Sequence, residues 1–163
     1  MIQAGIGFDS HPFAKDRVLV LGGVRIPGTD GLAGHSDADV LTHAVIDALL
    51  GAAGLGDIGD HFPDSDRRYK GIASLKLLER TRKLLKINGF EFVHLDCTVL
   101  ADRPKLGPYK IRIRRSLAST LGIPSRAVNL KAKTTQGLGN FGAQAGMVAW
   151  AIATVSRTKK VSR

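Results

Sequence analysis

Residues 34–66 constrain the fold more than any other stretch, and they read GHSDADVLTHAVIDALLGAAGLGDIGDHFPDSD. An apolar run with helical character occupies residues 40–53, and histidine and aspartate crowd both of its ends. Ser36 can serve as the N-cap of this helix, and we expect its end near Gly51 or Gly54. The helix would then carry polar chemistry at its entrance and a rigid loop rich in glycine and aspartate at its exit. This arrangement indicates a metal or phosphate site rather than a solvated face.

The remaining segments predict an α+β fold, an α/β sandwich. Strand character marks residues 2–12, 18–26, 90–100 and 127–134, and helical spacing marks residues 68–87 and 108–121. Residues 146–156 suit either a helix or a buried strand. These elements imply a mixed sheet of four to five strands with three helices packed on one face. Nothing repeats and no linker divides the chain, so we expect one domain over residues 1–163, with a basic tail at about 157–163.

Side-chain alternation assigns residues of two strands to faces. Asp9 and His11 are two residues apart, so they would project from the same face of the first strand. Residues 18–26 are interrupted by Gly22-Gly23, which predicts a hairpin with a bulge. In the strand at 90–100, alternation predicts one face made of Phe90, Phe92, His94, Asp96 and Thr98.

The formal charge of +10 favours anionic partners such as nucleic acid, a membrane surface or phosphorylated small molecules. Much of this charge lies in one helix and in the C-terminal tail, on Lys110, Arg112, Arg114, Arg115, Arg157, Lys159, Lys160 and Arg163. Only 6% of the residues are aromatic, which leaves little surface for stacking bases. The composition therefore argues against nucleic acid as the partner.

Cysteine content and hydropathy bear on the compartment. Cys97 is the single cysteine, which excludes an internal disulfide framework and is compatible with a reducing compartment. No run reaches the 18 or so apolar residues that a membrane span needs. The first residues, MIQAGIGFDSHPF, lack the basic segment and apolar run of a signal peptide. We expect a cytoplasmic protein that does not bind a membrane.

Asp9, His11 and His43 form the first candidate site. Two ligands at strand spacing plus one from a helix can occupy three corners of a tetrahedron and leave the fourth open, as in catalytic zinc sites. Asp47 follows His43 by one helical turn and could orient its free ring nitrogen. Spacing alone leaves open a surface Asp-x-His and a helix histidine bonded to a backbone carbonyl.

Three further segments carry candidate chemistry. Residues 34–36 lie at a helix entrance, where free N–H groups and the helix dipole favour a phosphate, although Ser36 could be only a cap. The acidic side chains of residues 57–66 could accept hydrogen bonds from sugar hydroxyls or bind a hard cation, or they could be turn formers. Residues 131–139 combine lysine, hydroxyls and glycines at a strand end, which suits a phosphate cradle.

Together these segments resemble one family over nearly the whole chain, the 2-C-methyl-D-erythritol 2,4-cyclodiphosphate synthases of the non-mevalonate isoprenoid pathway. The resemblance rests on GFDSHPF (7–13), LGGVRIPGTDGLAGHSDADVLTHAVIDALLGAAGLGDIGDHFPDSD (21–66), RPKLGP (103–108) and VNLKAKTT (128–135). It implies a strand at 146–156 and a homotrimer with active sites between subunits. It also implies a lyase reaction in which the 2-phosphate of 4-diphosphocytidyl-2-C-methyl-D-erythritol 2-phosphate attacks the β-phosphorus. The products are CMP and a cyclic diphosphate.

The resemblance also implies roles for individual residues. Asp9, His11 and His43 would bind Zn²⁺, and His35 and Thr134 would stabilise the transition state. Substrate would be bound by Asp9, Ser10, His11, His35, Ser36, Asp57, Ile58, Gly59, Phe62, Pro63, Asp64, Ser65, Asp66, Lys133, Thr134, Thr135 and Gln136. The nucleotide would be bound by Ala101, Asp102, Arg103, Pro104, Lys105, Leu106 and Gly107. A second divalent ion, Mg²⁺ or Mn²⁺, would bridge two phosphates. His61 matches no metal position.

The chain departs from the family pattern near its C-terminal end. Gln136 stands where a glutamate coordinates the second ion, so the affinity for that ion is in doubt, and Lys133 replaces a threonine. The ammonium of Lys133 could substitute for part of the missing charge. Asn140, Ala143 and Ala145 replace a phenylalanine, an arginine and a glutamate of the cavity on the trimer axis, which predicts weak or no binding of an isoprenoid diphosphate there.

Three alternatives to an active synthase follow from these observations. A divergent relative could keep zinc and nucleotide but turn over slowly because of Gln136. A zinc-dependent phosphohydrolase could use the same three ligands. A basic nucleic-acid-binding module would account for the charge, but it would leave residues 34–66 without a role.

Overall fold

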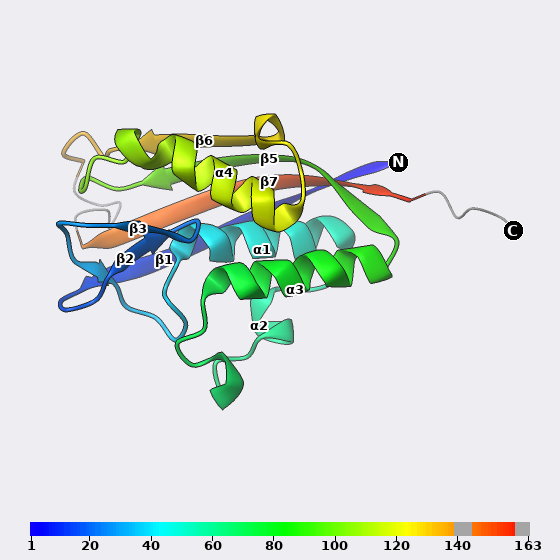
Figure 1. The fold of residues 1–163 in the computed structure, drawn as a ribbon, viewed down its shortest axis with the longest axis horizontal. Coiled ribbons are helices and arrows are strands. Elements are labelled where there is room, and N and C mark those ends of the chain that lie inside the picture. Colours follow the sequence, from blue (N-terminus) through cyan, green and yellow to red (C-terminus); the bar gives the residue numbers. More distant parts are fainter. Residues whose placement is uncertain (139–144, 159–163) are drawn as a thin grey trace, which may run out of the picture.

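A computed structural model describes residues 1–138 and 145–158 (Figure 1). Its main sheet has five strands in the order β4-β1-β7-β5-β6. Their bounds are Ile2–Ala14 for β1, Gly31–Leu32 for β4, Phe90–Leu100 for β5, Val128–Lys133 for β6 and Gly146–Arg157 for β7. β5 and β6 are parallel and the other neighbours are antiparallel. The predicted mixed sheet is confirmed, and residues 146–156 belong to a strand.

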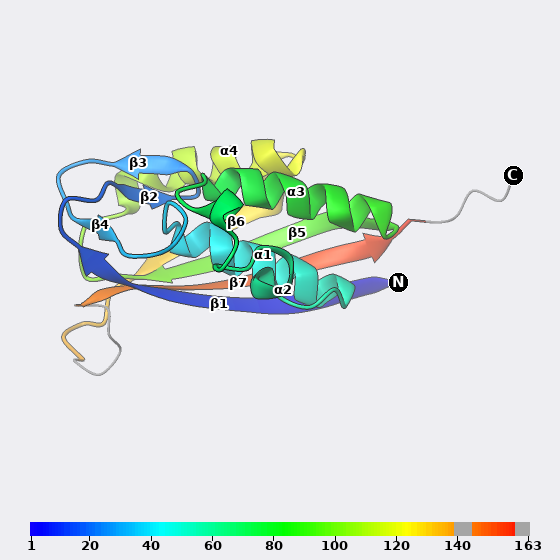
Figure 2. The ribbon, with the colours of Figure 1, turned by 90° about the horizontal axis from the view of Figure 1, so that it is seen from below.

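Three long helices cover one face of this sheet (Figure 2). They are α1 (Val40–Ala53), α3 (Ser74–Ile87) and α4 (Lys110–Leu121). The short elements are the helix α2 (Ile58–His61) and the 3₁₀ turns η1 (Arg67–Tyr69), η2 (Gly107–Tyr109) and η3 (Ser125–Ala127). Within the two described ranges, no helix is long and apolar enough to cross a membrane. Asn140, Ala143, Lys159, Lys160 and Arg163 lie outside the described residues.

A separate hairpin of β2 (Leu19–Leu21) and β3 (Val24–Ile26) flanks the sheet. Its turn is Gly22-Gly23, with φ of 55° and 72°, values that glycine adopts readily. Leu19 pairs with Ile26 and Leu21 with Val24 without a register shift, so the bulge expected here is wrong. Two residues with positive φ close a tight hairpin whose twist matches the strands, and no extra residue is needed.

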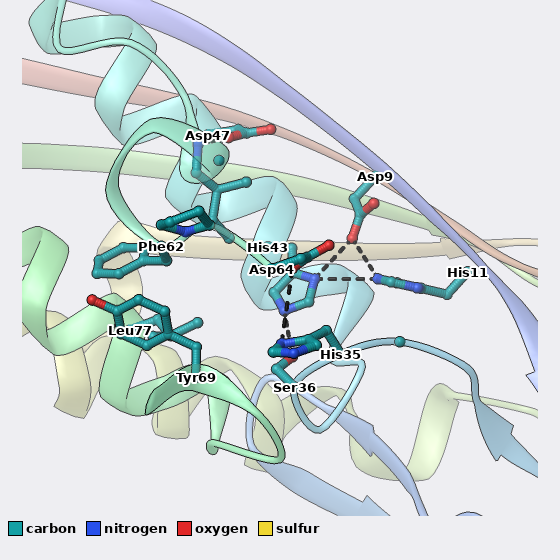
Figure 3. A pocket seen from close by; sticks show the side chains of 14 residues that line it. Asp9, His11, His35, Ser36, His43, Asp47, Phe62, Asp64, Tyr69 and Leu77 are labelled. Carbon is teal, nitrogen blue, oxygen red and sulfur yellow. Dashed lines mark hydrogen bonds and ion pairs between the residues drawn. The ribbon is translucent and has the colours of Figure 1, made fainter. Parts of the chain in front are cut away.

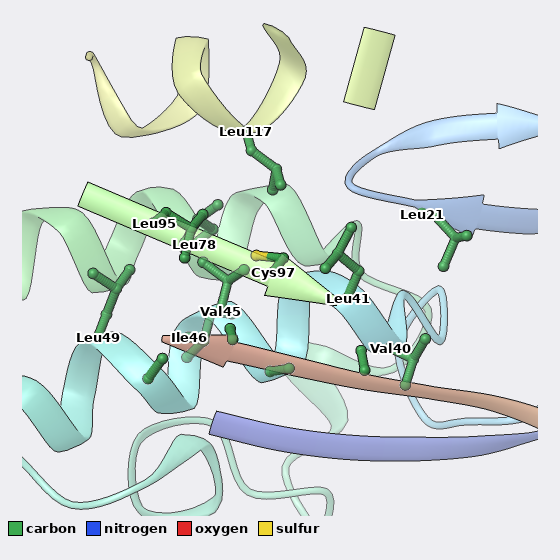
Figure 4. Close-up of a cluster of buried hydrophobic side chains, with 14 of the residues drawn as sticks. Leu21, Val40, Leu41, Val45, Ile46, Leu49, Leu78, Leu95, Cys97 and Leu117 are labelled. Atoms are coloured by element: carbon green, nitrogen blue, oxygen red, sulfur yellow. The ribbon is translucent and has the colours of Figure 1, made fainter. Parts of the chain in front are cut away.

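Helix α1 lies at the centre of the core, between the sheet and α3 (Figure 4). Leu41, Val45, Ile46 and Leu49 are fully buried, and their neighbours come from every layer. Burial of each such side chain contributes about 1.5–3 kcal/mol to folding. A helix that is apolar on nearly all sides is stable only when it is covered on all sides. The chain is therefore folded around α1.

The start of α1 differs from the prediction. The helix begins at Val40, and its N-cap is Asp39 rather than Ser36. The Asp39 carboxylate accepts hydrogen bonds from the backbone N–H and the hydroxyl of Thr42, and from the N–H groups of Gly22 and Gly23. The buried carboxylate thus caps the helix and ties it to the β2–β3 turn, which sequence spacing does not reveal.

Helix α3 also begins later than expected, at Ser74 instead of Arg68. The Asp66 carboxylate accepts from the Arg68 N–H and starts the short turn η1, and Gly71 then adopts a φ of 67° that no helix continues through. The third predicted helix likewise begins at Lys110, after the turn η2. The stops at Asn88-Gly89 and at Gly122 agree with the prediction.

Strand β5 does not keep one alternation along its length. Its pairing with β7 shifts register between Phe92 and His94, as at a β-bulge. Val93 is therefore 39% exposed, and Phe90 is buried with Leu95 in the core. The prediction that Phe90 shares a face with His94, Asp96 and Thr98 is wrong, because the bulge reverses the alternation.

Candidate functional site

The first strand and the first helix build the candidate site. In β1 the odd-numbered residues face α1, and the row Gly5, Gly7, Asp9, His11 runs along the helix. A Cβ on Gly7 would overlap the carbonyl oxygen of Ala44, so the strand and the helix are in backbone contact there. Asp9 and His11 follow directly, opposite the first turn of α1, where His43 projects.

Asp9, His11 and His43 meet at one point (Figure 3). Asp9 Oδ2 lies 2.9 Å from His11 Nε2 and 3.0 Å from His43 Nδ1. The two ring nitrogens are 3.2 Å apart. All three side chains are only partly buried, so the group can be reached from solvent. The sequence prediction that these three side chains share a site agrees with this geometry.

This donor set fits a metal ion. One ligand atom from each residue lies within 4.8 Å of the others. Tetrahedral zinc has bonds of about 2.0–2.1 Å, which place neighbouring ligands about 3.3 Å apart. Two imidazoles and one carboxylate are zinc ligands by type, and three protein ligands leave one position open. The site could therefore hold a catalytic metal.

Charge at the site favours an ionised carboxylate. Burial opposes ionisation of Asp9, but the hydrogen bonds and charges of His11 and His43 outweigh it, and the pKa of Asp9 lies well below its usual range. Burial also disfavours the imidazolium of His43, yet the hydrogen bond to Asp9 raises the pKa of this ring. Asp9 thus brings a negative charge to this group of three side chains.

Asp47 does not orient His43, which corrects the expectation from spacing. Its Oδ1 accepts a hydrogen bond of 2.8 Å from the N–H of Ile58. His43 Nε2 instead lies 3.0 Å from Ser36 Oγ and 2.9 Å from Ser74 Oγ. Ser74 was missed from sequence because it was placed inside a helix running from residue 68, and no local signal marks it.

A cavity of about 440 Å³ opens beside the three ligands. It is lined by Asp9, His11, Gly34, His35, Ser36, His43, Asp47, Ile58, Gly59, Phe62, Pro63, Asp64, Tyr69 and Leu77. His35 Nδ1 lies 4.0 Å from Oδ1 of Asp64, whose side chain is largely exposed. The structure therefore brings the predicted phosphate-binding segment 34–36 and part of segment 57–66 to the predicted metal ligands.

Other predicted substrate residues lie outside this lining. Asp57 forms a capping box with Asp60 at the start of α2. Asp66 caps η1 and pairs with Arg68. Ser65 is not among the lining residues. Ser10 lines a shallow hollow on the opposite side of β1. His61 bonds the carbonyl of Leu55 at 2.7 Å, in agreement with its omission from the ligands.

A second cavity, also about 440 Å³, gathers the predicted nucleotide-binding segment. Its lining is Ala101, Asp102, Pro104, Lys105, Leu106, Gly107, Pro108, Lys110, Ala132, Lys133 and Thr134. The Asp102 carboxylate accepts 2.8 Å hydrogen bonds from the N–H and the hydroxyl of Thr135, so it holds the loop after β6 against this segment. Arg103 instead lies over the ring of Phe13 and pairs with Asp30.

The model of the YgbB family matches residues 2–156. The chain belongs to the YgbB family. A 2-C-methyl-D-erythritol 2,4-cyclodiphosphate synthase of Desulfosudis oleivorans is 54% identical over 154 residues, which are 94% of this chain and 92% of that protein. The resemblance inferred from sequence motifs is thereby confirmed.

Solved structures with similar sequences share the fold. The bifunctional IspDF from Campylobacter jejuni superposes with a TM-score of 0.92 at 41% identity, over 98% of this chain and 43% of that longer chain. A CDP-bound 2C-methyl-D-erythritol-2,4-cyclodiphosphate synthase superposes with a TM-score of 0.86 at 37% identity, over 94% of this chain and 99% of that one. The phosphohydrolase and nucleic-acid-binding alternatives gain no support from these relatives.

Gln136, where the resemblance implies a glutamate, adopts an unusual backbone conformation. Gln136 has a φ of 56°, and its amide Nε2 lies 3.1 Å from Thr134 Oγ1, to which it donates. Neither Gln136 nor Thr134 lines the cavity at Asp9. Lys133 and Thr134 line the second cavity. Within one chain, therefore, Thr134 and His35 belong to two different cavities.

Proposed function

We propose that this chain converts 4-diphosphocytidyl-2-C-methyl-D-erythritol 2-phosphate to 2-C-methyl-D-erythritol 2,4-cyclodiphosphate and CMP. The observation that carries the proposal is the Asp9, His11 and His43 group at the mouth of a cavity, in a chain of the YgbB family. The net charge of +10 suits a substrate with three phosphorus atoms.

The reaction needs no protein nucleophile, because the substrate carries its own. An oxygen of the 2-phosphate forms a bond to the β-phosphorus, the bond from that phosphorus to the cytidylate oxygen breaks, and CMP leaves. Two anionic groups must approach each other in line, so the protein's task is to neutralise charge and fix orientation. A zinc ion held by Asp9, His11 and His43 would supply positive charge that polarises a phosphate oxygen.

The chain's own residues provide the remaining interactions in this proposal. His35 and Ser36 line the cavity beside the candidate ligands, where they would donate hydrogen bonds to the phosphates. The backbone of residues 58–64 shapes the side that would face the methylerythritol part. The second cavity, with Pro104, Lys105 and Gly107, would take the cytidine, and Thr134 at its edge would donate to the diphosphate.

A reaction assay tests the proposed activity. With zinc and Mg²⁺ or Mn²⁺ present, the purified chain is expected to release one CMP per cyclic diphosphate, which phosphorus NMR detects. Inorganic phosphate as the product would contradict the proposal and favour a phosphohydrolase.

The variant Gln136→Glu is expected to lower the Mg²⁺ or Mn²⁺ concentration for half-maximal rate by roughly tenfold, because a carboxylate replaces a neutral amide oxygen. An unchanged ion requirement would show that Gln136 does not weaken a second-ion site.

We further propose that the chain assembles as a homotrimer with active sites between subunits. The sheet face opposite the helices exposes the large apolar side chains Ile2, Ile6, Phe8 and Ile152. A patch of this kind requires a partner, and a second copy of the same sheet face offers equally apolar surface. Assembly would also unite the two cavities that lie apart within one chain.

The mass of the particle in solution tests this assembly. Light scattering after size exclusion is expected to give three times the chain mass of 17.4 kDa at micromolar concentration. A mass of one chain at the concentration at which the protein is active would contradict the trimer, and would leave the proposed reaction untouched.

A further inference from the structure

Ser74 contacts the metal-facing histidine from behind. It is the first residue of α3 and is fully buried. Its Oγ lies 2.9 Å from Nε2 of His43, on the side of the ring opposite to Nδ1, the atom that faces Asp9 and His11. The metal-facing nitrogen and the serine-facing nitrogen thus belong to one imidazole, and the proton on one determines the state of the other.

The Ser74 hydroxyl donates its proton to Asp37. Ser74 Oγ lies 2.5 Å from Oδ1 of Asp37, and the backbone N–H of Ser74 donates to Oδ2 of the same carboxylate. A carboxylate only accepts, so Ser74 must be the donor in this contact. Its oxygen can then only accept from His43, and the proton between them belongs to Nε2.

The contacts of Ser36 are also compatible with a proton on Nε2 of His43. Its Oγ lies 3.0 Å from His43 Nε2 and 3.2 Å from Ser74 Oγ, and it accepts from the N–H of Ala38. Since Nε2–H can serve both hydroxyl oxygens, His43 does not need the Ser36 proton. Because the Ser74 hydroxyl donates to Asp37, Ser36 is the donor in the 3.2 Å contact between the two hydroxyls.

The backbone holds this arrangement together across two segments distant in sequence. Asp37 N–H donates to the carbonyl of Ile72, and Gly71 N–H donates to the carbonyl of His35. The loop before α1 is thereby joined to the loop before α3. The carboxylate of Asp37 and the hydroxyl of Ser74 consequently meet at a fixed place.

We propose that Asp37 and Ser74 are positioning residues that hold His43 in its Nε2–H tautomer and direct the Nδ1 lone pair at the metal. This inference rests on the metal site of the proposed function. It differs from a purely structural role of Ser74, in which the serine would only stabilise the start of α3. The structural role predicts a loss of stability and no change in metal affinity.

Substitution at Ser74 separates these roles. Ser74→Ala is expected to lower zinc affinity by about 10–100-fold, the usual effect of losing a hydrogen-bond partner of a ligand histidine. Affinity is measured by competition with a chromophoric chelator at fixed pH. Thr81→Ala is the matched control, because Thr81 is fully buried in the same helix and, among the described residues, its hydroxyl bonds only the carbonyl of Leu77. It is expected to lose stability and keep the zinc affinity.

Asp37→Asn changes the tautomer without changing volume. The amide can donate to Ser74 Oγ, which frees the serine proton for Nε2 of His43 and places the imidazole proton on Nδ1. Zinc affinity is expected to fall by about 10–100-fold again. Equal zinc affinity in the wild type and in folded Ser74→Ala and Asp37→Asn would overturn the proposal.

Nitrogen-15 NMR of the zinc-loaded wild-type chain decides the tautomer even if a variant fails to fold. The expected spectrum has a protonated Nε2 and a metal-bound Nδ1 on His43. A metal-bound Nε2, or an unprotonated one, would contradict the proposal. Failure of the wild-type chain to bind zinc at all would instead refute the metal site of the proposed function, so the two failures are distinguishable.

Discussion

Replacing Asp9 with asparagine is expected to lower zinc affinity by a factor of about 100–1,000 and to reduce turnover at least as much. Asp9 Oδ2 is the atom that lies closest to both histidine nitrogens, and it carries the only negative charge of the three ligands. An amide oxygen keeps the shape of the side chain but not its charge. With about 10–16 kcal/mol for a four-ligand zinc site, one ligand accounts for roughly 2.5–4 kcal/mol.

Asp47→Asn is the matched control for this substitution. Asp47 lines the same cavity and is also an aspartate, but its Oδ1 bonds the N–H of Ile58, and the asparagine oxygen can accept the same bond. Zinc affinity and turnover are expected to stay within about twofold of the wild type. Isothermal titration and the CMP assay measure both quantities. If Asp9→Asn and Asp47→Asn behaved alike, the ion would not be held by Asp9.

Local periodicity accounts for the part of this site that was foreseen. Alternation in a strand depends only on neighbouring residues, so Asp9 and His11 could be assigned to one face from sequence. The apolar run at 40–53 predicted a helix with His43 near its start, and the structure begins α1 at Val40. These local rules, with the family motifs, placed the three candidate ligands on a strand and a helix, as the structure has them.

Contacts between distant segments account for what was not foreseen. The Asp39 carboxylate caps α1 and also binds the turn at Gly22-Gly23, and the second partner cannot be read from a capping pattern. Ser74 reaches His43 across 31 positions in sequence. Asp47 lies one helical turn from His43. Its carboxylate instead accepts a hydrogen bond from the N–H of Ile58, which has no partner within α2 because it lies at the start of that helix.

The separation of the two cavities has the same origin. Strand β6 delivers Thr134 to the segment 101–107, because β5 and β6 are parallel neighbours and their ends lie together. The Asp9 cavity lies beside β1 and α1, where residues 34–36 and part of segment 58–64 also line it, and none of its lining residues belongs to the second cavity. Motif spacing gives no distance between such segments. The proposed reaction requires His35 and Thr134 at one substrate, but in this fold they line two different cavities. A second chain would have to bring the two cavities together.

Gly7→Ala is expected to destabilise the chain by about 3 kcal/mol or more and to weaken zinc binding at the same time. The new methyl group would overlap the backbone carbonyl of Ala44, which no side-chain rotation can relieve, so α1 must move away from β1. His43 precedes Ala44 on the helix, whereas Asp9 and His11 remain on the strand. A displacement of α1 therefore pulls the third ligand away from the first two.

Gly51→Ala is the control within the same helix. Its Cβ would lie 4.0 Å from the nearest atom, the carbonyl oxygen of Ile6, which is ordinary contact. Because alanine favours a helix over glycine, this variant is expected to gain up to about 1 kcal/mol. Urea denaturation at one fixed protein concentration compares the two variants, and chelator competition gives their zinc affinities. If Gly7→Ala were as stable as Gly51→Ala, or lost stability while keeping full zinc affinity, the contact between β1 and α1 would not be what aligns the three ligands.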